Sequence, residues 1–211
     1  MKNVLVLGAT GQIAQLAIIF LQNQPDIFLT LFVRDKNKLA PLPMTNTRII
    51  EGDVLNIDQL TDAMKDQDVV YANLAGDMEG QTQNIVAGMN TLKIQRLISI
   101  NTLGIYDEVP GEFGEWNNKE IGEYFPPYRK SADLIESSNL DYTILRAAWL
   151  TDENEVDFEI THKADAFKGT VVSRKSIAYL VNQIIENPKL YSKENLGVSK
   201  PNSDADKPYF M

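Results

Sequence analysis

A short apolar run near the start of the chain leads into glycines whose spacing is typical of an anion-binding turn. Val4–Leu7 is followed directly by Gly8 and Gly11, and the small residue Ala14 comes three positions later. Gly8 can adopt backbone angles that other residues avoid, Gly11 lets the main chain approach a ligand closely, and Ala14 keeps the following helix near the sheet. That helix would direct its free N–H groups and the positive end of its dipole at an anion, such as the pyrophosphate of a dinucleotide. The common fingerprint is G-x-G-x-x-G, whose middle spacing this loop lacks, so a plain strand-to-helix turn stays an alternative.

Such a loop needs a sheet behind it, and the rest of the sequence predicts one. Apolar, β-rich runs alternate with amphipathic or mixed segments. Strands are expected at residues 4–7, 27–33, 47–50, 68–72, 96–100 and 141–146. Helices are expected at about 36–39, 57–65, 81–92 and 117–138, with the last bent or interrupted at Pro126 and Pro127. This alternation predicts an α/β fold, a Rossmann-type doubly wound parallel sheet, with its ligand crevice at the carboxyl ends of the first and fourth strands.

The pattern of elements changes after Arg146. Residues 155–163 and 169–172 are typical of extended segments, 173–186 of a helix capped by Ser173 or Ser176, and 195–199 of a last strand. The polar tail, residues 200–211, is expected to be loose until its last aromatic residues. We therefore interpret residues 1–211 as a single dinucleotide-binding domain in which residues 147–199 contribute a small C-terminal region that covers the substrate.

Composition excludes several classes of protein. The chain has 211 residues, 44% hydrophobic and 23% charged, as expected for a soluble globular protein. Its net charge of -9 argues against binding to nucleic acid or to an anionic membrane surface. It has no cysteine, which excludes disulfides, thiolate nucleophiles and cysteine metal sites. With neither a signal-like start nor an apolar stretch near the roughly 20 residues of a membrane span, a cytoplasmic location is the expectation.

Six segments, spread in order over almost the whole chain, carry a resemblance to a known family. They are GATGQIA at 8–14, FVRD at 32–35, EGDV at 51–54, NLAG at 73–76, NTLGIYDE at 101–108 and SSNLDYTILRAAWL at 137–150. Together they resemble an atypical short-chain dehydrogenase/reductase, and most closely the NmrA-like NAD(P)H-binding family, whose small members are called NADH-flavin reductases and are similar to flavin/biliverdin reductases. The resemblance implies the fold and a nicotinamide cofactor, and it says far less about the substrate.

The residues after the second strand decide which nicotinamide cofactor is expected. An acidic residue there would bind the two ribose hydroxyls of NAD, whereas a guanidinium pairs with the 2′-phosphate of NADP. Arg34 therefore favours NADP(H), with NAD(H) as the second choice, and Lys36 and Lys38 could add positive charge. Asp35 stands next to it and could take the hydroxyls instead if it turned inward, and a solvated Arg–Asp pair is the structural alternative.

The resemblance also implies a set of cofactor-binding residues along five loops. Asp53 matches the position that meets the adenine amino group, although it could equally cap a helix. Residues 73–76 end the fourth strand, and their small side chains would leave room for the cofactor ribose. The whole expected set is Gly8, Thr10, Gly11, Gln12, Ile13, Arg34, Asp53, Val54, Leu74, Ala75, Gly76 and Thr102.

The catalytic residues are where the sequence departs from the family. Many short-chain dehydrogenases use a Ser or Thr after the fifth strand, a Tyr as acid, and a Lys four residues after that Tyr. Thr102 matches the first position, but the sequence contains no YxxxK. An ungapped count back from SSNLDYT puts Tyr124 and Tyr128 at the Tyr and Lys positions, whereas a register centred on Lys130 puts Pro126 at the Tyr position. Our candidate catalytic residues are Thr102, Tyr128 and Tyr124.

Other residues with chemical potential have plainer alternatives. Trp149 could stack on an aromatic substrate or cap the core. Tyr106 is a further aromatic near the end of the fifth strand. The single histidine, His162, has no second histidine or cysteine with which to bind a metal, so no metal site is expected.

These observations favour a reductase that transfers a hydride from NADPH to a small aromatic or quinoid acceptor, of the flavin or quinone type. Such acceptors take a hydride readily and can be protonated from water, so positioning is most of what the protein must supply. The alternative is a catalytically silent NADP(H)-binding redox sensor that acts through a protein partner, as regulatory members of the NmrA-like family do. A sugar-nucleotide epimerase is disfavoured by the missing Tyr–Lys pair. We expect a monomer or a homodimer.

Overall fold

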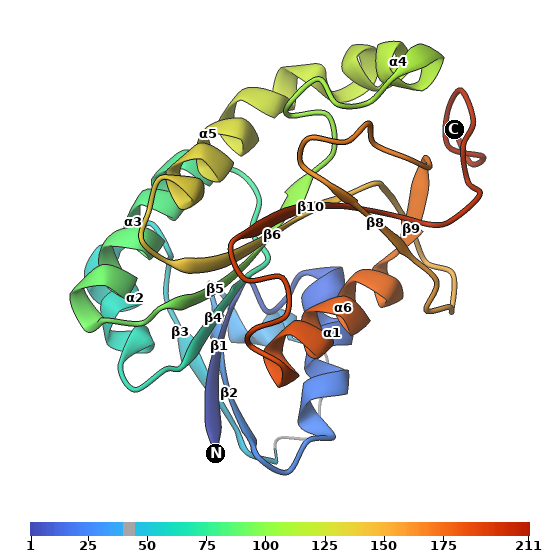
Figure 1. The fold of residues 1–211 in the computed structure, drawn as a ribbon. Coiled ribbons are helices and arrows are strands. Elements are labelled where there is room, and N and C mark those ends of the chain that lie inside the picture. The colour runs from blue at the N-terminus through green and yellow to red at the C-terminus, as the bar shows by residue number, and fades with distance from the viewer. Residues whose placement is uncertain (40–44) are drawn as a thin grey trace.

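The strands form one large sheet and one small one, and the computed structural model describes residues 1–39 and 45–211. The large sheet has the strand order β3-β2-β1-β4-β5-β6-β10-β8, and all its strands run parallel except the edge strand β8. β7 and β9 pair separately (Figure 1). The strand bounds are β1 Lys2–Leu7, β2 Ile27–Val33, β3 Thr47–Glu51, β4 Val69–Ala72, β5 Arg96–Thr102, β6 Asp141–Ala147, β7 Trp149–Thr151, β8 Glu159–His162, β9 Val171–Ser173 and β10 Glu194–Ser199. The predicted Rossmann-type α/β fold is confirmed.

Helices cover both faces of the large sheet. α1 and α6 pack together on one face, while α2, α3 and α5 lie side by side on the other (Figure 1). α4 extends beyond the sheet at the end where the carboxyl ends of the strands lie. The helix bounds are α1 Gln12–Gln22, α2 Ile57–Met64, α3 Met78–Leu92, α4 Gly111–Ile121, α5 Phe125–Glu136 and α6 Arg174–Glu186, with 3₁₀ turns η1 at Lys36–Lys38 and η2 at Gly122–Tyr124.

The alternation of side chains along β1 divides the interior into two cores. Val4 and Val6 belong to the core under α1 and α6. Leu5 and Leu7 belong to the core under α2, α3 and α5. All four side chains are fully buried, which is the pattern of a strand covered on both faces. β1 is thus the common wall of the two cores, and the glycine loop starts where this wall ends.

One predicted helix has different bounds in the structure. In place of a single helix over 117–138, α4 begins at Gly111, after Pro110, and the chain is interrupted at η2 before α5 starts. Pro126 and Pro127 lie in the first turn of α5 and do not interrupt it. Proline is tolerated there because the first N–H groups of a helix have no partner within the helix.

The region after β6 adds to the large sheet as well as covering it. β10 inserts beside β6, and of the segment 155–163 only β8 is a strand. Ser173 is the N-cap of α6, because its hydroxyl accepts the Ser176 N–H at 2.9 Å. The expectation of a loose tail is wrong as far as Asp204: Lys200 N–H donates to the Val171 carbonyl at 2.7 Å, and the Asp204 carboxylate accepts a backbone N–H at 2.9 Å.

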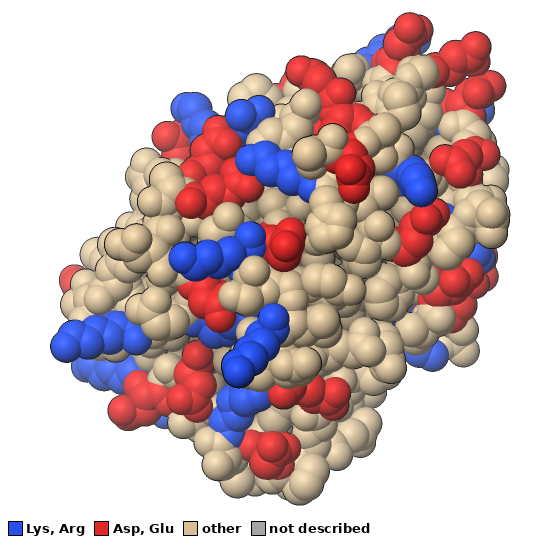
Figure 2. All heavy atoms as spheres, viewed as in Figure 1, with Lys and Arg blue, Asp and Glu red and all other residues tan. Residues whose placement is uncertain are grey.

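The described residues form no helix that could span a membrane, and the face drawn in Figure 2 shows no broad basic patch. Within residues 1–39 and 45–211, every helix is too short or too polar to traverse a bilayer. On the face drawn in Figure 2, Lys and Arg lie interspersed among Asp and Glu, in agreement with the net charge of -9.

Candidate functional site

The glycine loop is shaped by its contact with the end of β4. Gly8 has a φ of +75°, and a Cβ built on it would lie 2.2 Å from the carbonyl oxygen of Asn73. A Cβ on Gly11 would lie 2.1 Å from Asn73 Nδ2. The Gly11 N–H also donates to the Gly8 carbonyl at 2.9 Å and closes the turn. Gly8 is therefore required by the approach of the Asn73 backbone, whereas a side chain at Gly11 would have to displace the end of the Asn73 side chain, before any ligand is considered.

The start of α1 is suited to an anion. Gly11 is the N-cap and makes no side-chain capping bond, and the first turn of the helix carries no acidic residue. Its first N–H groups therefore have no partner within the helix and lie at the positive end of the helix dipole.

A cavity of about 510 Å³ lies beside this loop, at the carboxyl ends of β1 to β4. It contains eight of the expected cofactor-binding residues: Gly8, Thr10, Gly11, Arg34, Asp53, Val54, Leu74 and Ala75. We call it the first cavity. Gln81, from α3, also lines it, and the buried Gln81 Oε1 has no hydrogen-bond partner among the described residues. A ligand with hydrogen-bond donors, such as an adenine amino group or a ribose hydroxyl, would give this oxygen a hydrogen-bond partner.

The structure separates the roles of Arg34 and Asp35. One carboxylate oxygen of Asp35 accepts the N–H and the side-chain amide of Asn37, both at 3.0 Å, and so caps η1. Arg34 is exposed on the cavity wall and has no ion pair among the described residues. The guanidinium is thus available for a ligand, while the acidic alternative is engaged in its own turn.

Asp53 lines the first cavity but does not cap a helix. Its carboxylate accepts the Leu55 N–H at 3.0 Å, within its own turn. The N-cap of α2 is Asn56, whose side chain accepts the Gln59 N–H at 3.2 Å. The capping role considered for Asp53 is therefore wrong, and its role toward a cofactor remains a prediction.

A second cavity of about 280 Å³ adjoins the first and shares Asn73 and Leu74 with it. Its other lining residues come from distant parts of the chain: Gln12, Ile13, Ile100, Asn101, Thr102, Tyr128, Ala147, Ala148, Leu150 and Arg174. The structure therefore brings Thr102 and Tyr128 together on one cavity wall. Asn73 was absent from the predicted set, although it stands in the NLAG segment that suggested its neighbours.

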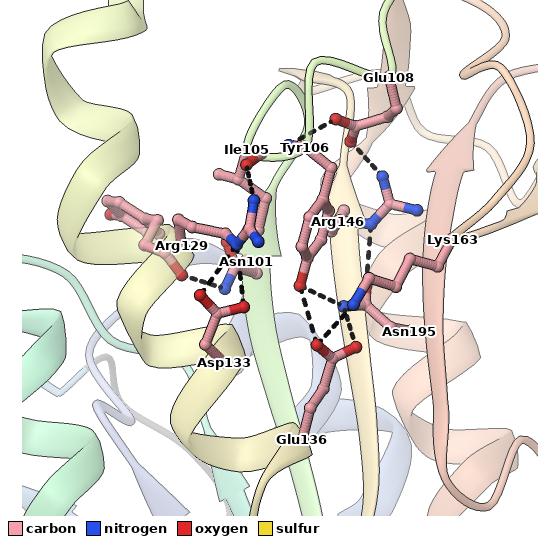
Figure 3. Close-up of polar contacts among 11 residues, drawn as sticks. Asn101, Ile105, Tyr106, Glu108, Arg129, Asp133, Glu136, Arg146, Lys163 and Asn195 are labelled. Atoms are coloured by element: carbon pink, nitrogen blue, oxygen red, sulfur yellow. Dashed lines mark hydrogen bonds and ion pairs between the residues drawn. The ribbon is translucent and has the colours of Figure 1, made fainter.

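Asn101 fixes the two hydroxyl-bearing residues of this cavity. Its side-chain amide donates to the backbone carbonyl of Tyr128 at 3.1 Å, and its oxygen accepts the Thr102 N–H at 2.8 Å. The close-up in Figure 3 shows Asn101 between the strand and α5. Burial raises the pKa of Tyr128 above its ordinary value, so its hydroxyl stays protonated at neutral pH. A tyrosinate–lysine couple would need the opposite shift.

Tyr124, Gly76 and Lys130 lie apart from this constellation. Tyr124 belongs to η2, is 57% exposed and lines neither cavity; a hydrogen bond to Glu123 raises its pKa. Gly76 has a φ of +94° at the turn before α3 and lies outside both cavity linings. Lys130 pairs with Glu79 at 2.8 Å on the surface. Among the described residues, therefore, Tyr128 is the only tyrosine that lines either of these two cavities. Lys130 is paired with Glu79, away from both.

A buried polar network organises the chain just beyond Thr102. Arg146 is fully buried and forms an ion pair with Glu108. Glu108 also accepts the backbone N–H groups of Gly104, at 3.1 Å, and Tyr106, at 2.9 Å. Arg146 Nε donates to Asn195 at 2.8 Å, which connects β6 to β10 (Figure 3). The network fixes the loop that follows β5.

Tyr106 is the centre of the outer part of this network. Its hydroxyl donates to Glu136 at 3.2 Å and accepts from Asn195 at 2.9 Å. Arg129 and Lys163 lie over its ring at 4.4 and 4.3 Å, as Figure 3 shows. Sequence reasoning missed this network; the available signal was a charged residue, Arg146, inside an apolar strand.

A third cavity of about 300 Å³ continues from the second past the side chain of Trp149. It shares Thr102, Ala148, Leu150 and Arg174 with the second cavity and adds Leu103, Ile121 and Trp149. Trp149 Nε1 donates to Asn117 at 2.8 Å, and its ring lies 4.9 Å from the Trp116 ring. Trp149 therefore packs against other side chains and also faces a cavity, so both of its considered roles remain open.

His162 is exposed, with Nδ1 3.4 Å from Glu194. Among the residues described, no group of three or more His, Cys, Asp or Glu side chains is arranged to hold a metal ion.

A sequence profile for NAD(P)H-binding proteins matches residues 8–188. The chain belongs to this NAD(P)H-binding family. A search of the curated proteins finds no match.

Three solved structures illustrate the likeness. A Rossmann-fold NAD(P)-binding family protein from Shigella flexneri is 46% identical, with all of both chains covered and a TM-score of 0.87. A short-chain dehydrogenase/reductase from Veillonella parvula, solved in complex with NADP, is 29% identical, with 99% of each chain covered and a TM-score of 0.92. An anaerobillin reductase from Escherichia coli shares only the fold: it is 15% identical, with 97% of this chain and 100% of that chain covered and a TM-score of 0.84.

Proposed function

We propose that this protein is an NADPH-dependent reductase that transfers a hydride to a small aromatic or quinoid acceptor of the flavin or quinone type. The observation that carries the proposal is the pair of adjoining cavities that share Asn73 and Leu74. One has the features of a dinucleotide site, and the other presents Thr102 and Tyr128 and continues into a cavity lined by Trp149. We also propose, more narrowly, that this chain is one of the NmrA-like flavin reductases.

The residues present fit the cofactor. Gly8, Gly11 and the start of α1 would hold the pyrophosphate, because both glycines line the first cavity and the first N–H groups of α1 have no partner within the helix. Arg34 would pair with the 2′-phosphate, and NAD(H) is the second choice. The NADP complex of the Veillonella relative supports this preference. When bound, the nicotinamide supplies the hydride.

The protein's own part in the reaction is positioning and exclusion of water. Apolar residues of the second cavity, Ile100, Ala147 and Ala148 among them, would confine the acceptor ring near Thr102. The Thr102 hydroxyl could orient an acceptor carbonyl, and the protonated Tyr128 hydroxyl could donate a hydrogen bond or a proton. A flavin or quinone can also be protonated from water, so neither hydroxyl is essential in this scheme.

The test is NADPH oxidation, followed at its near-ultraviolet absorbance, with flavins and quinones offered as acceptors. Turnover that saturates with NADPH and with the acceptor is the expected result. Tight NADPH binding without turnover of any acceptor would instead favour the redox sensor that acts through a protein partner. The pairing of Lys130 with Glu79, away from any cavity tyrosine, is the observation that keeps this alternative in view.

A further inference from the structure

Arg174 lies where the second and third cavities meet. It lines both of them, together with Thr102, Ala148 and Leu150. It is the first residue of α6, and its side chain is only 19% exposed. A mostly buried arginine side chain on the wall of two cavities points to an anionic ligand, because arginine keeps its positive charge under all ordinary conditions.

The protein's own partner for this guanidinium is weak. Arg174 Nη1 donates to the Asp152 carboxylate at 2.8 Å, but the Asp152 side chain is 80% exposed. A carboxylate so well hydrated gains little from the pair. An arginine guanidinium carries five N–H donors in a fork. Within the described chain, only the Nη1 nitrogen of Arg174 makes a hydrogen bond. The remaining donors are available to a second anion.

The walls beside Arg174 are apolar and partly aromatic. Leu103, Ile121 and Leu150 line the third cavity together with Trp149, whose indole N–H is held by Asn117. A flat, conjugated ring packs well against a fixed indole. Apolar walls with one charged group at the side are the usual arrangement by which a pocket selects both the body of a ligand and its substituent.

The position of Arg174 argues for the acceptor and against the cofactor as the source of this anion. None of the residues that line the third cavity comes from the glycine loop. Arg174 also lines the second cavity, together with Gln12 and Ile13 at the start of α1, but it does not line the first cavity. The phosphates of a dinucleotide are already provided for by the start of α1 and by Arg34.

We propose that Arg174 binds an anionic substituent, a carboxylate or a phosphate, of a planar aromatic acceptor whose ring lies against Trp149. The natural acceptor is then an anionic aromatic compound, and Arg174 is a specificity-determining residue. This inference rests on the proposed reductase function, because only a reductase has an acceptor. Measurements of flavin affinity test the anion site separately from turnover.

The experiment compares FMN with riboflavin, which share one ring system and differ by a phosphate. Binding of each flavin to the NADP⁺-loaded protein is measured by quenching of flavin fluorescence, for the unaltered protein, Arg174→Ala, Arg174→Lys and the control Lys175→Ala. Lys175 is the adjacent cation, bonded to Asn154 and outside all three cavity linings. FMN should bind at least about tenfold more tightly than riboflavin, and Arg174→Ala should remove that preference while Lys175→Ala keeps it.

Two conservative variants, Arg174→Lys and Asp152→Asn, guard against a trivial loss of folding. Arg174→Lys keeps the charge and loses the fork, so it should retain part of the preference for FMN. Asp152→Asn removes the competing carboxylate and should maintain or increase that preference. Equal affinity of the unaltered protein for the two flavins, or an equal loss of both in Arg174→Ala, would overturn the inference. A tenfold loss of NADPH affinity in Arg174→Ala would also overturn it and assign the residue to the cofactor.

Turnover separates this inference from the proposed function. An intact FMN preference in binding, with no NADPH oxidation by any acceptor, would remove the reductase and leave the anion site standing. Reduction of FMN and riboflavin with the same KM would leave the reductase standing and overturn the anion site.

Discussion

The two halves of the candidate site are built in different ways. The walls of the first cavity come largely from short loops that directly follow β1, β2, β3 and β4, and they consist largely of backbone, small side chains and a few polar groups. The second and third cavities combine the ends of β5 and β6 with α5, β7 and the start of α6. The first half depends on local turns, and the second on contacts between distant segments. This difference explains why the cofactor is easier to infer than the acceptor.

The largest expected effect is on the stability of the acceptor half. Glu108→Gln would leave the Arg146 guanidinium, which is fully buried, without its counter-charge. Breaking a buried pair in this way costs about 3–5 kcal/mol, to be measured as the free energy of unfolding in urea. Glu120→Gln, an exposed carboxylate on α4, is the control and should change stability by less than about 0.5 kcal/mol.

The same variant tests whether the halves are separable. Under conditions where Glu108→Gln is folded, its NADPH affinity should stay within about twofold, or roughly 0.4 kcal/mol, of the unaltered protein. An equal loss of NADPH affinity and stability would mean that the network supports both halves, and the comparison would fail.

The next largest effect is on the cofactor half. Gly11→Val should weaken binding of both NADPH and NADH by more than about 100-fold, equivalent to about 2.8 kcal/mol. The new side chain would displace Asn73, which lies 2.1 Å from the position of its Cβ, and would also crowd the approach to the start of α1. Calorimetric titration of both cofactors measures the change. Gly122→Ala is the control, because a Cβ there meets only Asn118 at 3.9 Å. A folded Gly11→Val protein with normal affinity would reduce the loop to a plain turn.

Arg34 provides a smaller and more selective effect. Arg34→Ala should weaken NADPH by about 1.5–3 kcal/mol, the range for a hydrogen bond to a charged group, and leave NADH nearly unchanged. Lys36→Ala removes the same charge two positions later, where the amine lies 4.0 Å from Glu51 and outside the first cavity, and it should have little effect. Equal affinity of the unaltered protein for NADH and NADPH would contradict the assignment and return the ribose to Asp35.

The smallest effects are expected at the hydroxyls. Tyr124→Phe and Tyr128→Phe should each keep flavin or quinone reduction within about tenfold, or roughly 1.4 kcal/mol of barrier, and Thr102→Ala should also cost little. Because burial raises the pKa of Tyr128, the rate should show no ionisation of this group between about pH 6 and 9. Steady-state kinetics across that range checks both points. A hundredfold loss at Tyr128 with unchanged NADPH affinity would identify it as the proton donor after all.

The sequence predicted the parts of the fold whose signals are local. The six parallel strands up to β6 were found because each is an apolar run bounded by turns, and Ser173 was a correct cap because its hydroxyl needs only the N–H three residues later. The start of α4 was missed because Gly111 and Pro110 are typical of a loop. Its place is fixed instead by packing against β7, where the Trp116 ring lies 4.9 Å from the Trp149 ring.

The candidate site divides along the same line. Eight of the twelve expected cofactor-binding residues line the first cavity, because each follows its strand directly. Asn73 was missed although it too follows its strand directly. Arg174 and the Glu108–Arg146 pair were missed because their roles depend on partners far along the chain. The sequence around Tyr124 does not show whether its side chain is buried, and only the fold shows that it is exposed.

The two-sided burial of β1 limits how this protein can change by insertion and deletion. Val4 and Val6 face one core and Leu5 and Leu7 the other, so adding or removing one residue within the strand would send the side chains on one side of the change to the wrong core. It would also reverse the direction in which the chain enters Gly8. The spacing between the start of β1 and the glycine loop is therefore a fixed length, and variation among related chains should gather in loops at the opposite end of the sheet, away from the cavities.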